Sequence, residues 1–532
     1  MDLSFASGAL DSPPADAQRG LSRRDFRKVA PNGFGDGNNS YCHSMAWFQG
    51  HVYAGTSRAT MALLGAGDKG GMKDVSLDVW PVEMTARVYS REFELTQARA
   101  EIWRMNPYEG IWRRVFQAPL VRGVDGTLMS RDLGYRAMCV FQGESDAFPC
   151  LYVSTWSRSR GLGLQILRSE DGTRFEPAGS PGLAGLDATS TRSLVEFKGR
   201  LFTSPTGATA GRQNASGIAA IFESRDLVRG TWVPANQRGF GDTTNLGVFE
   251  IIATDTHLYA GTANLAQGYQ LWRTTAEGNP PYHWERVLTN GAGRGRLNQG
   301  VVSMAAHRGA IFVGSGIQKG GIDKDNKVGP AGPELIRLNE DGSHDIIMGE
   351  NRPVNGAAGG RKTGPLSGLL PGWNNVFCGS IWKMNTHDGW LYAGTQDWLC
   401  FLLWRDFNKL HSPAGQIFRN MEMQGFIERG GGYDLWRSRD GETWLPVTRS
   451  GFENPYNHGI RNILSTPTGV YVGSSNQFGP RAAFQVSPGQ WEYHDNPRGG
   501  TEIWHGTVAG QPQPAGTIEP PPRSTDDETE GA

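Results

Sequence analysis

Three arginines and one histidine take the same place in a strand that recurs along the chain. The residues two positions before the apolar anchor of each recurring strand are His43, Arg136, Arg192, Phe249, Val302, Gly379 and Arg461. Guanidinium groups bind carboxylate, phosphate or sulfate through paired hydrogen bonds. If the strands are consecutive around a common axis, Arg461, His43, Arg136 and Arg192 form one basic arc. We therefore expect an anion site at this arc.

Chemistry on a bound anion also needs a group that transfers protons. His43 and Glu250, which precedes the anchor of the fourth strand by one residue, are the candidate catalytic residues, because His and Glu are common general acids and bases. Tyr41, Tyr135 and Asn462 are candidate substrate-binding residues alongside the arginines. In the alternative interpretation, the arginines donate hydrogen bonds to carbonyls and acidic side chains between neighbouring sheets and have a structural role.

A metal centre is an alternative use of the same region. His43 and His458 map to the same end of adjacent recurring strands, with Asp36 or Asp132 nearby. Two histidines and a carboxylate can hold one metal ion. The eleven histidines do not otherwise cluster, so no cofactor is predicted and a divalent metal is the alternative.

The strands that position these residues form a sevenfold repeat. An apolar strand ending in a Gly-Thr-like pair begins at His51, Leu151, Leu201, Leu258, Ile311, Leu391 and Val470. A further strand follows each and begins at Glu101, Gln165, Ala220, Gln270, Glu334, Asp434 and Glu502. Strand-rich units repeated at roughly 50 residues or more are typical of a β-propeller. We predict an all-β fold, a single seven-bladed β-propeller.

The anchors of the inner strands come from an alignment of these units. They are Met45, Met138, Leu194, Ile251, Met304, Ile381 and Ile463. Six residues before the anchor, five units carry an asparagine: Asn39, Asn245, Asn298, Asn375 and Asn457. Such recurrence favours a structural cap that fixes the connecting turn.

The two ends of the chain are predicted to meet. The seventh unit has no fourth strand after 502–505, whereas Phe26 to Val29 aligns with the outer strands of other units. An N-terminal strand would complete the last blade and close the ring, which removes exposed sheet edges. The expected organisation is a disordered segment over 1–20, the propeller over 21–508 and a disordered acidic tail over 509–532.

Two turns between third and fourth strands share a Ser-x-Asp-Gly pattern. They read Ser169-Glu-Asp-Gly-Thr-Arg-Phe175 and Ser438-Arg-Asp-Gly-Glu-Thr-Trp444. These turns resemble the Asp boxes of the sialidase-like (BNR) propeller superfamily. The resemblance covers only these short turns and implies the fold, because Asp boxes are structural in that superfamily.

A sialidase-like reaction would need more than the turns. It requires an arginine triad, a tyrosine paired with a glutamate, and an acid. The arginines of the basic arc, Tyr41 or Tyr135, and Glu250 could be arranged in this way. The superfamily's Arg-Ile-Pro signature is absent, and seven blades rather than six are predicted, so the resemblance is one of fold only.

Three long insertions fall on one face of the predicted ring. They cover 57–100, 350–372 and 396–432, with a helix expected near 415–423. Loops of this length in compact domains are commonly binding loops or lids. We therefore expect the site at the mouth of the central channel on this face.

The net charge and the hydropathy of the chain limit the kinds of partner that we expect. The 532-residue chain has a net charge of −1, which provides no field to attract nucleic acid or an anionic membrane. The arginine pair in 22–28 resembles an export signal but lacks the apolar stretch that must follow, so it is interpreted as a strand and a cytoplasmic location is expected. Cys139 and Cys150 flank one hairpin loop, and buried thiols are favoured over a disulfide.

These patterns lead to one functional hypothesis and one rival. The hypothesis is a monomeric propeller enzyme that binds an anionic small molecule or saccharide at the channel mouth, with hydrolase- or lyase-type chemistry. The rival is a non-catalytic propeller, lectin-like or a scaffold, that binds a ligand or a protein. Asymmetric loops favour one specialised site, whereas a multivalent lectin would repeat its pocket in each blade.

Overall fold

The computed structural model describes residues 19–58, 95–158, 160–183, 186, 188–207, 219–317, 321, 323, 326–355, 361–404, 416–418, 421–487, 490–508 and 510–520. β-strands dominate this part of the chain, which confirms the predicted all-β class. Antiparallel pairing groups most of the strands into units of four. Units are numbered 1 to 7 in the order of their first strands.

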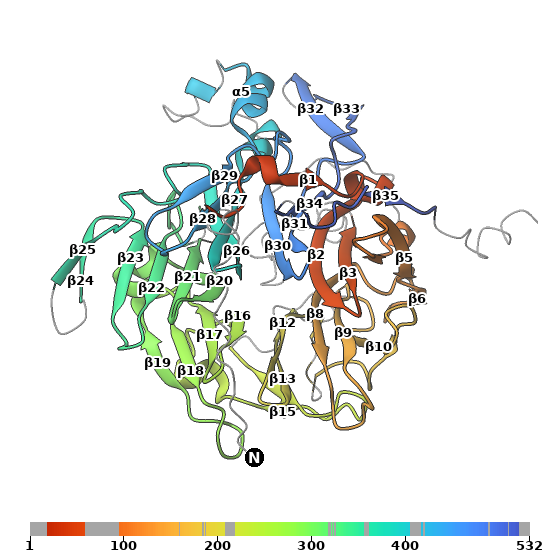
Figure 1. The fold of residues 1–532 in the computed structure, drawn as a ribbon, viewed down its shortest axis with the longest axis horizontal. Coiled ribbons are helices and arrows are strands. Elements are labelled where there is room, and N and C mark those ends of the chain that lie inside the picture. The colour runs from red at the N-terminus through yellow and green to blue at the C-terminus, as the bar shows by residue number, and fades with distance from the viewer. Residues whose placement is uncertain are drawn as a thin grey trace, which may run out of the picture.

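The first two strands of each unit form a hairpin. The first strands face a common centre (Figure 1) and are β2 (Asn39–Phe48), β8 (Gly134–Phe141), β12 (Ser190–Phe197), β16 (Gly247–Ala253), β20 (Gly300–His307), β26 (Cys378–His387) and β30 (Gly459–Thr466). The second strands are β3 (His51–Arg58), β9 (Cys150–Trp156), β13 (Arg200–Thr206), β17 (Leu258–Ala263), β21 (Ala310–Gly316), β27 (Trp390–Asp397) and β31 (Gly469–Ser475).

The other two strands lie further from the centre. The third strands are β4 (Glu101–Met105), β10 (Ile166–Ser169), β14 (Phe222–Ser224), β18 (Leu271–Thr274), β22 (Leu335–Leu338), β28 (Leu435–Ser438) and β34 (Ile503–Gly506). The fourth strands are β5 (Ile111–Gln117), β11 (Glu176–Pro177), β15 (Val233–Pro234), β19 (Glu285–Leu288), β23 (His344–Met348), β29 (Leu445–Thr448) and β1 (Phe26–Lys28). Single-residue bridges link several adjacent units, so 25 strands form one sheet and β12 to β15 form a separate one.

Smaller elements decorate the units. They are the hairpins β6 (Leu120–Arg122) with β7 (Leu128–Ser130), β24 (Arg352–Asn355) with β25 (Arg361–Gly364) and β32 (Arg481–Ser487) with β33 (Gln490–Asp495), the 3-10 segment η10 (Leu399–Trp404) and the helix α5 (Met423–Gly430). Residues 416–418, inside the range predicted to be helical, form a short helical segment, and α5 begins at Met423. Much of the first insertion, 59–94, lies outside the described residues.

The N-terminal strand pairs with the seventh unit. β1 runs antiparallel to β34, with Phe26 opposite Gly506, as the sequence predicts. Just before β1, the Arg23 guanidinium lies 5.0 Å from the Phe452 ring centroid and pairs with Glu453. The segment that resembles an export signal thus packs on unit 7.

The chain beyond unit 7 returns to unit 1. β35 (Thr517–Ile518) pairs in parallel with β5, and Glu519 pairs with Arg113 at 2.7 Å. Residues 516–519, which belong to the stretch predicted to be a disordered tail, therefore lie against β5 and the turn before it. Residues 1–18 and 521–532 lie outside the described part of the chain.

A recurring cluster fixes the turn that enters each of several units. In unit 1, Asn39 Nδ2 donates to the Gly33 carbonyl at 2.9 Å and to Glu101 Oε2 at 2.8 Å. Trp103 Nε1 donates to the same carboxylate at 3.0 Å, and Phe34 stacks on Trp103 with centroids 4.8 Å apart. Gly33 has φ 57°, a left-handed conformation that glycine adopts most readily. We call this set the turn–strand cluster.

Three further asparagines repeat the arrangement. Each donates to a glycine carbonyl in its turn and to an acid or amide at the start of the third strand; they are Asn245, Asn298 and Asn457. The predicted structural role is therefore confirmed for these and for Asn39.

The Asp-containing turns also behave as predicted. Asp171 Oδ1 accepts from the amides of Thr173 and Arg174 at 2.7 and 2.9 Å. Hydrogen bonds from these amides, with Arg174 the largest contributor, hold the pKa of Asp171 at about 2. The matching turn in unit 6 has the same pattern around Asp440. The Asp side chains thus close turns.

The cysteines in the structure are free thiols, including Cys139 and Cys150. Burial raises the pKa of both thiols, to about 12 and about 11. The two thiols are unpaired, as favoured; Cys150 is buried and Cys139 is partly buried. Across the described ranges, no helix has the length and apolar character needed to cross a membrane.

Candidate functional site

Every inner strand is interrupted by a register shift at an equivalent place. The residues at these shifts are His43, Arg136, Arg192, Phe249, Val302, Trp382 and Arg461. A β-bulge re-aims the side chain it carries. We call these seven the bulge residues, and His43 with the three arginines the basic arc.

The sequence predicted six of the seven bulge residues and missed the one in unit 6. There, Met384 pairs with Ala393, as Met45 pairs with Ala54 in unit 1. The anchor of β26 is therefore Met384 and not Ile381. Both residues are apolar and lie three positions apart, so the pattern could not separate them. The bulge residue becomes Trp382 instead of Gly379.

With Met384 as the anchor, Asn375 no longer takes the position of the predicted turn asparagines. Its Nδ2 donates to Asp397 Oδ2 at 2.9 Å instead. Asp397 is fully buried, and burial raises the pKa of its carboxyl to about 8. Asn375 therefore stabilises a buried acid in unit 6.

His43 lies at the middle of the basic arc. Its Nε2 is 3.3 Å from Arg461 Nη2, and its Nδ1 is 2.6 Å from Ser57 Oγ. Because a guanidinium only donates, Nε2 accepts, so Nδ1 carries the proton and donates to Ser57. Burial first, then the charges of Arg461, Arg136 and Arg192, hold the pKa of His43 well below its usual range. His43 is a neutral imidazole at pH 7.

The three arginines of the arc lie against aromatic rings. Arg136 is 5.4 Å from the centroid of Trp156 and Arg192 is 4.0 Å from that of Phe249. Arg461 is 5.2 Å from the Trp382 ring. A guanidinium over a ring face gains cation–π attraction and keeps its edge for hydrogen bonds. These rings therefore orient the guanidiniums.

Opposite the arc, the bulge residues are apolar. Phe249, Val302 and Trp382 pack with Tyr41 and Ala263 in one buried cluster. The centre of the molecule is thus basic along units 7, 1, 2 and 3 and apolar along units 4, 5 and 6. Such a surface fits a ligand with an anionic group on one side and an apolar face on the other.

Glu250 is engaged in an ion pair that the sequence did not predict. Lys383 Nζ donates to Glu250 Oε1 at 3.0 Å. The two residues follow the bulge residues Phe249 and Trp382, so the pair joins unit 4 to unit 6. Aligning β26 on Met384 would have placed Lys383 beside Glu250 in the pattern.

The predicted substrate-binding residues separate into different environments. Tyr41 lies beside His43, with ring centroids 5.5 Å apart, and its hydroxyl accepts from Gln477 Nε2 at 2.6 Å. Tyr135 packs instead in the apolar core between units 1 and 2. Asn462 Nδ2 donates to the Cys42 carbonyl at 2.6 Å and ties unit 7 to unit 1.

The residues of the metal alternative do not converge. His458 Nε2 is 3.0 Å from Ser475 Oγ, and burial lowers the pKa of its ring to about 3. Asp36 pairs with Arg58, and Asp132 with a neighbouring arginine. Within the described ranges, no three His, Cys, Asp or Glu side chains gather in a way that could hold a metal ion.

Exposure changes along the inner strands. Before the bulge, His458 and Tyr41 are 0% and 3% exposed, and Phe401 of η10 lies 4.8 Å from the His458 ring. After the bulge, the Lys383 side chain is 29% exposed and that of Glu250 is 13% exposed. The prediction placed the open mouth on the side of the long insertions. The accessible side chains next to the bulge residues, Lys383 and Glu250, lie instead on the carboxyl-terminal side of the bulges in the inner strands.

Comparisons with known proteins give distant likenesses only. No family model matches the chain, and no curated protein matches its sequence. Among solved structures, polysaccharide lyase Uly1 is 9% identical over 88% of this chain and 90% of its own, with a TM-score of 0.44. A Mycobacterium tuberculosis puromycin-hydrolyzing peptidase is 11% identical over 92% of this chain and 57% of its own, with a TM-score of 0.41. An ulvan lyase has 10% identity over 72% of this chain and 86% of its own, with a TM-score of 0.35. Function therefore has to be argued from the site itself.

Proposed function

We propose that the seven units are the blades of one closed β-propeller. The inner strands face a common centre (Figure 1). Tyr41 of unit 1 is bridged to Ser475 of unit 7, and β1 supplies the fourth strand of that last unit. Closure of this kind leaves no exposed sheet edge between the first and last blades.

We propose that this propeller binds an anionic small molecule or saccharide at the bulge residues, as a monomer, and acts on it by lyase- or hydrolase-type chemistry. The observation that carries the proposal is the placement of Arg136, Arg192 and Arg461 at bulges equivalent to that of His43, with Arg461 Nη2 3.3 Å from His43 Nε2. Three fixed positive charges beside a neutral imidazole favour an anion. The apolar side of the bulge residues, including Trp382, would take the less polar face of the ligand.

His43 is the proposed proton acceptor. Its Nε2 lone pair faces Arg461. An anion that draws Arg461 toward itself would release this lone pair to accept a proton from the ligand. The remaining guanidiniums would offset negative charge that develops on the ligand, which is the usual electrostatic contribution to catalysis.

A non-catalytic ligand-binding propeller is the second candidate. It is favoured by the ion pair between Glu250 and Lys383, which occupies one of the two predicted proton-transfer groups. It is also favoured by the two hydrogen bonds that hold the His43 ring. In this version the arc binds the anion and no bond is broken.

A thermal-shift screen followed by an activity assay tests the proposal. Sulfate, small carboxylates, and sulfated or uronic-acid oligosaccharides should raise the melting temperature, since ligands that bind the native state stabilise it. Arg192→Met and Arg461→Met should abolish the shift, whereas Arg286→Met, an exposed arginine beside Trp272, should retain it. No anion-dependent shift, or the same shift in all variants, would refute the anion site.

The variant His43→Gln tests catalysis separately from anion binding. This variant should still bind the anion and lose turnover of whichever oligosaccharide the wild-type protein cleaves. Binding without turnover in the wild type, across the whole panel, would support the non-catalytic candidate.

A further inference from the structure

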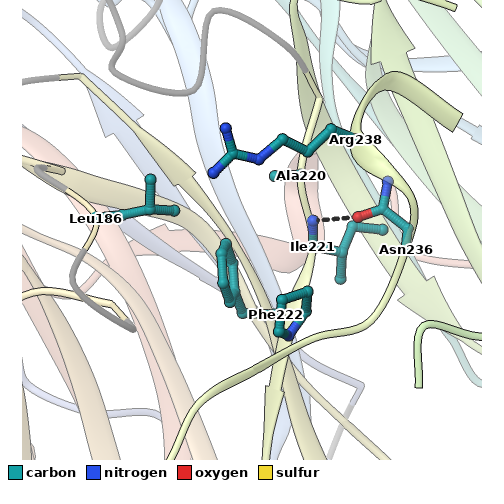
Figure 2. A pocket seen from close by; sticks show the side chains of 7 residues that line it. Leu186, Ala220, Ile221, Phe222, Asn236 and Arg238 are labelled. Carbon is teal, nitrogen blue, oxygen red and sulfur yellow. Dashed lines mark hydrogen bonds between the residues drawn. The ribbon is translucent and has the colours of Figure 1, made fainter. Parts of the chain in front are cut away.

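A cavity of about 350 Å³ lies in unit 3, away from the bulge residues. Figure 2 shows the residues around it, which are Leu186, Ala220, Ile221, Phe222, Pro234, Asn236 and Arg238. Its size is within the range of small-molecule pockets, roughly 300–1,000 Å³. Most of its lining is apolar, with one arginine.

The cavity occupies the place where other units have the turn–strand cluster. Phe222 pairs with Thr203 and with Pro234. In unit 1, the matching residue is Trp103, which pairs with Ala54 and Arg114. The register therefore makes Phe222 the equivalent of Trp103, and places Ala220 where unit 1 has a glutamate.

Unit 3 is the only unit with an apolar residue at this position of the third strand. The other six have an acid or amide there: Glu101, Gln165, Gln270, Glu334, Asp434 and Glu502. Each of these side chains is hydrogen-bonded in the structure. The asparagine that begins the inner strand in unit 1 is also replaced, by Ala188. Loss of these side chains leaves the cavity.

The rest of the fold indicates what shape the cavity accepts. In four other units an aromatic ring from the turn stacks on the third-strand tryptophan, at centroid distances of 4.8, 4.8, 5.8 and 4.3 Å: Phe34 on Trp103, Phe240 on Trp272, Trp373 on Trp436 and Phe452 on Trp504. In unit 3 the equivalent residue is Leu183, which follows Gly182 as Phe34 follows Gly33 and is buried in the same core cluster as Phe222. Leu186 and Phe222 line the cavity (Figure 2). Because Leu183 has no ring, a flat ring that enters the cavity can still pack on the Phe222 ring that lines it.

Arg238 adds a charge preference. Its side chain is exposed, and Figure 2 shows its guanidinium reaching across the cavity toward Leu186. No hydrogen bond or ion pair of this guanidinium is found among the described residues, whereas Asn236 already accepts from the Ile221 amide at 2.7 Å. A carboxylate at the rim of the cavity would gain a charge-assisted, two-point contact with Arg238.

We infer that unit 3 has a second ligand site, which takes a planar aromatic carboxylate: the ring stacks on Phe222 and the carboxylate binds Arg238. The site is independent of the function proposed for the bulge residues, since it shares no residue with them. The ligand brings a ring and an anionic group to a place where unit 3 has Leu183 and Ala220.

Isothermal titration calorimetry with indole-3-acetate tests this inference. The neutral amide indole-3-acetamide is the matched ligand, and we expect it to bind at least about tenfold more weakly, because it cannot form the ion pair with Arg238. Arg238→Gln should reduce indole-3-acetate binding to the level of the amide. Arg286→Gln, which removes an exposed arginine elsewhere, should leave it unchanged.

A filling variant provides the second arm. Ala220→Gln restores the residue type that two other units have at this position, so it should fold with an unchanged or higher melting temperature and lose binding of both indole ligands. Wild-type protein that binds neither ligand, or Ala220→Gln that binds indole-3-acetate as wild type does, would overturn the inference. Sulfate stabilisation, measured in parallel with Arg192→Met, reports on the bulge residues separately.

Discussion

Glu502 provides the sharpest test of the turn–strand cluster. Its side chain is 4% exposed and accepts from Asn457 Nδ2 at 2.7 Å and Trp504 Nε1 at 2.9 Å. Asn454 Nδ2 and Asn32 Nδ2 donate to its other oxygen at 3.1 Å. Glu502→Ala would leave buried donors without an acceptor. Each such donor costs about 1–3 kcal/mol, partly offset by water that enters the vacated space, so we expect a total loss of about 4 kcal/mol.

The measurement is urea unfolding followed by tryptophan fluorescence. Glu502→Gln keeps one acceptor oxygen and turns an NH₂ group toward donors, so its loss should be about half as large. The control is Glu453→Ala in the same unit, whose carboxylate is 62% exposed beside Arg23 and should cost less than about 1 kcal/mol. If Glu502→Ala costs no more than Glu453→Ala, the cluster does not stabilise the unit and the reasoning is refuted. Anion binding at the basic arc should be unchanged, because Glu502 lies just before the third strand β34 and not in the inner strand.

Three further predictions follow from buried charges and turns. Burial raises the pKa of Asp397 to about 8, so the native state keeps this proton at a pH where the unfolded chain has lost it. The free energy of unfolding should therefore decrease as the pH rises from about 4 to about 8. Asp397→Asn should flatten that slope in pH-dependent urea unfolding, and an equal slope would contradict the burial argument. Arg461→Met removes a positive charge beside His43, so the pKa of His43 should rise toward its usual range in an NMR titration of the ring; an unmoved pKa would show that burial alone sets it. Asp171→Ala should lower stability by about 1 kcal/mol through loss of the turn hydrogen bonds, whereas Asp171→Asn, which keeps an acceptor oxygen, should lose less in the same assay.

The strand repeat could be predicted because it rests on local patterns. A strand with an apolar anchor, a Gly-Thr pair and an Asp turn has its own signature at each recurrence, and β1 could be recognised by its likeness to other outer strands. The parts that failed depend on register or on contacts distant in sequence. β26 has two apolar residues three positions apart, Ile381 and Met384, and only cross-strand pairing distinguishes them.

The open side of the centre could not be predicted for a related reason. The length of the insertions indicates on which face of the molecule the extra residues lie. It does not indicate whether these residues leave the centre open or cover it. In the structure, η10 of one insertion packs Phe401 on His458, which buries that end. The return of β35 to β5 likewise depends on a contact between residues about 400 positions apart, and no local pattern reports it.

Across the seven units, the fold constrains some side-chain positions and leaves others free to vary. The position at or just before the start of the third strand has an acid or amide in six units, and each of these side chains is hydrogen-bonded, so this position is constrained by the architecture. The bulge position differs: it accommodates Arg, His, Phe, Val and Trp in equivalent backbone geometry. Since the bulge forms with any of these side chains, the arginines of the arc are not needed to build it. The grouping of three arginines and His43 in four neighbouring units therefore supports the proposed anion site, and the same reasoning applies in reverse to Ala220, where a constrained position has lost its polar side chain.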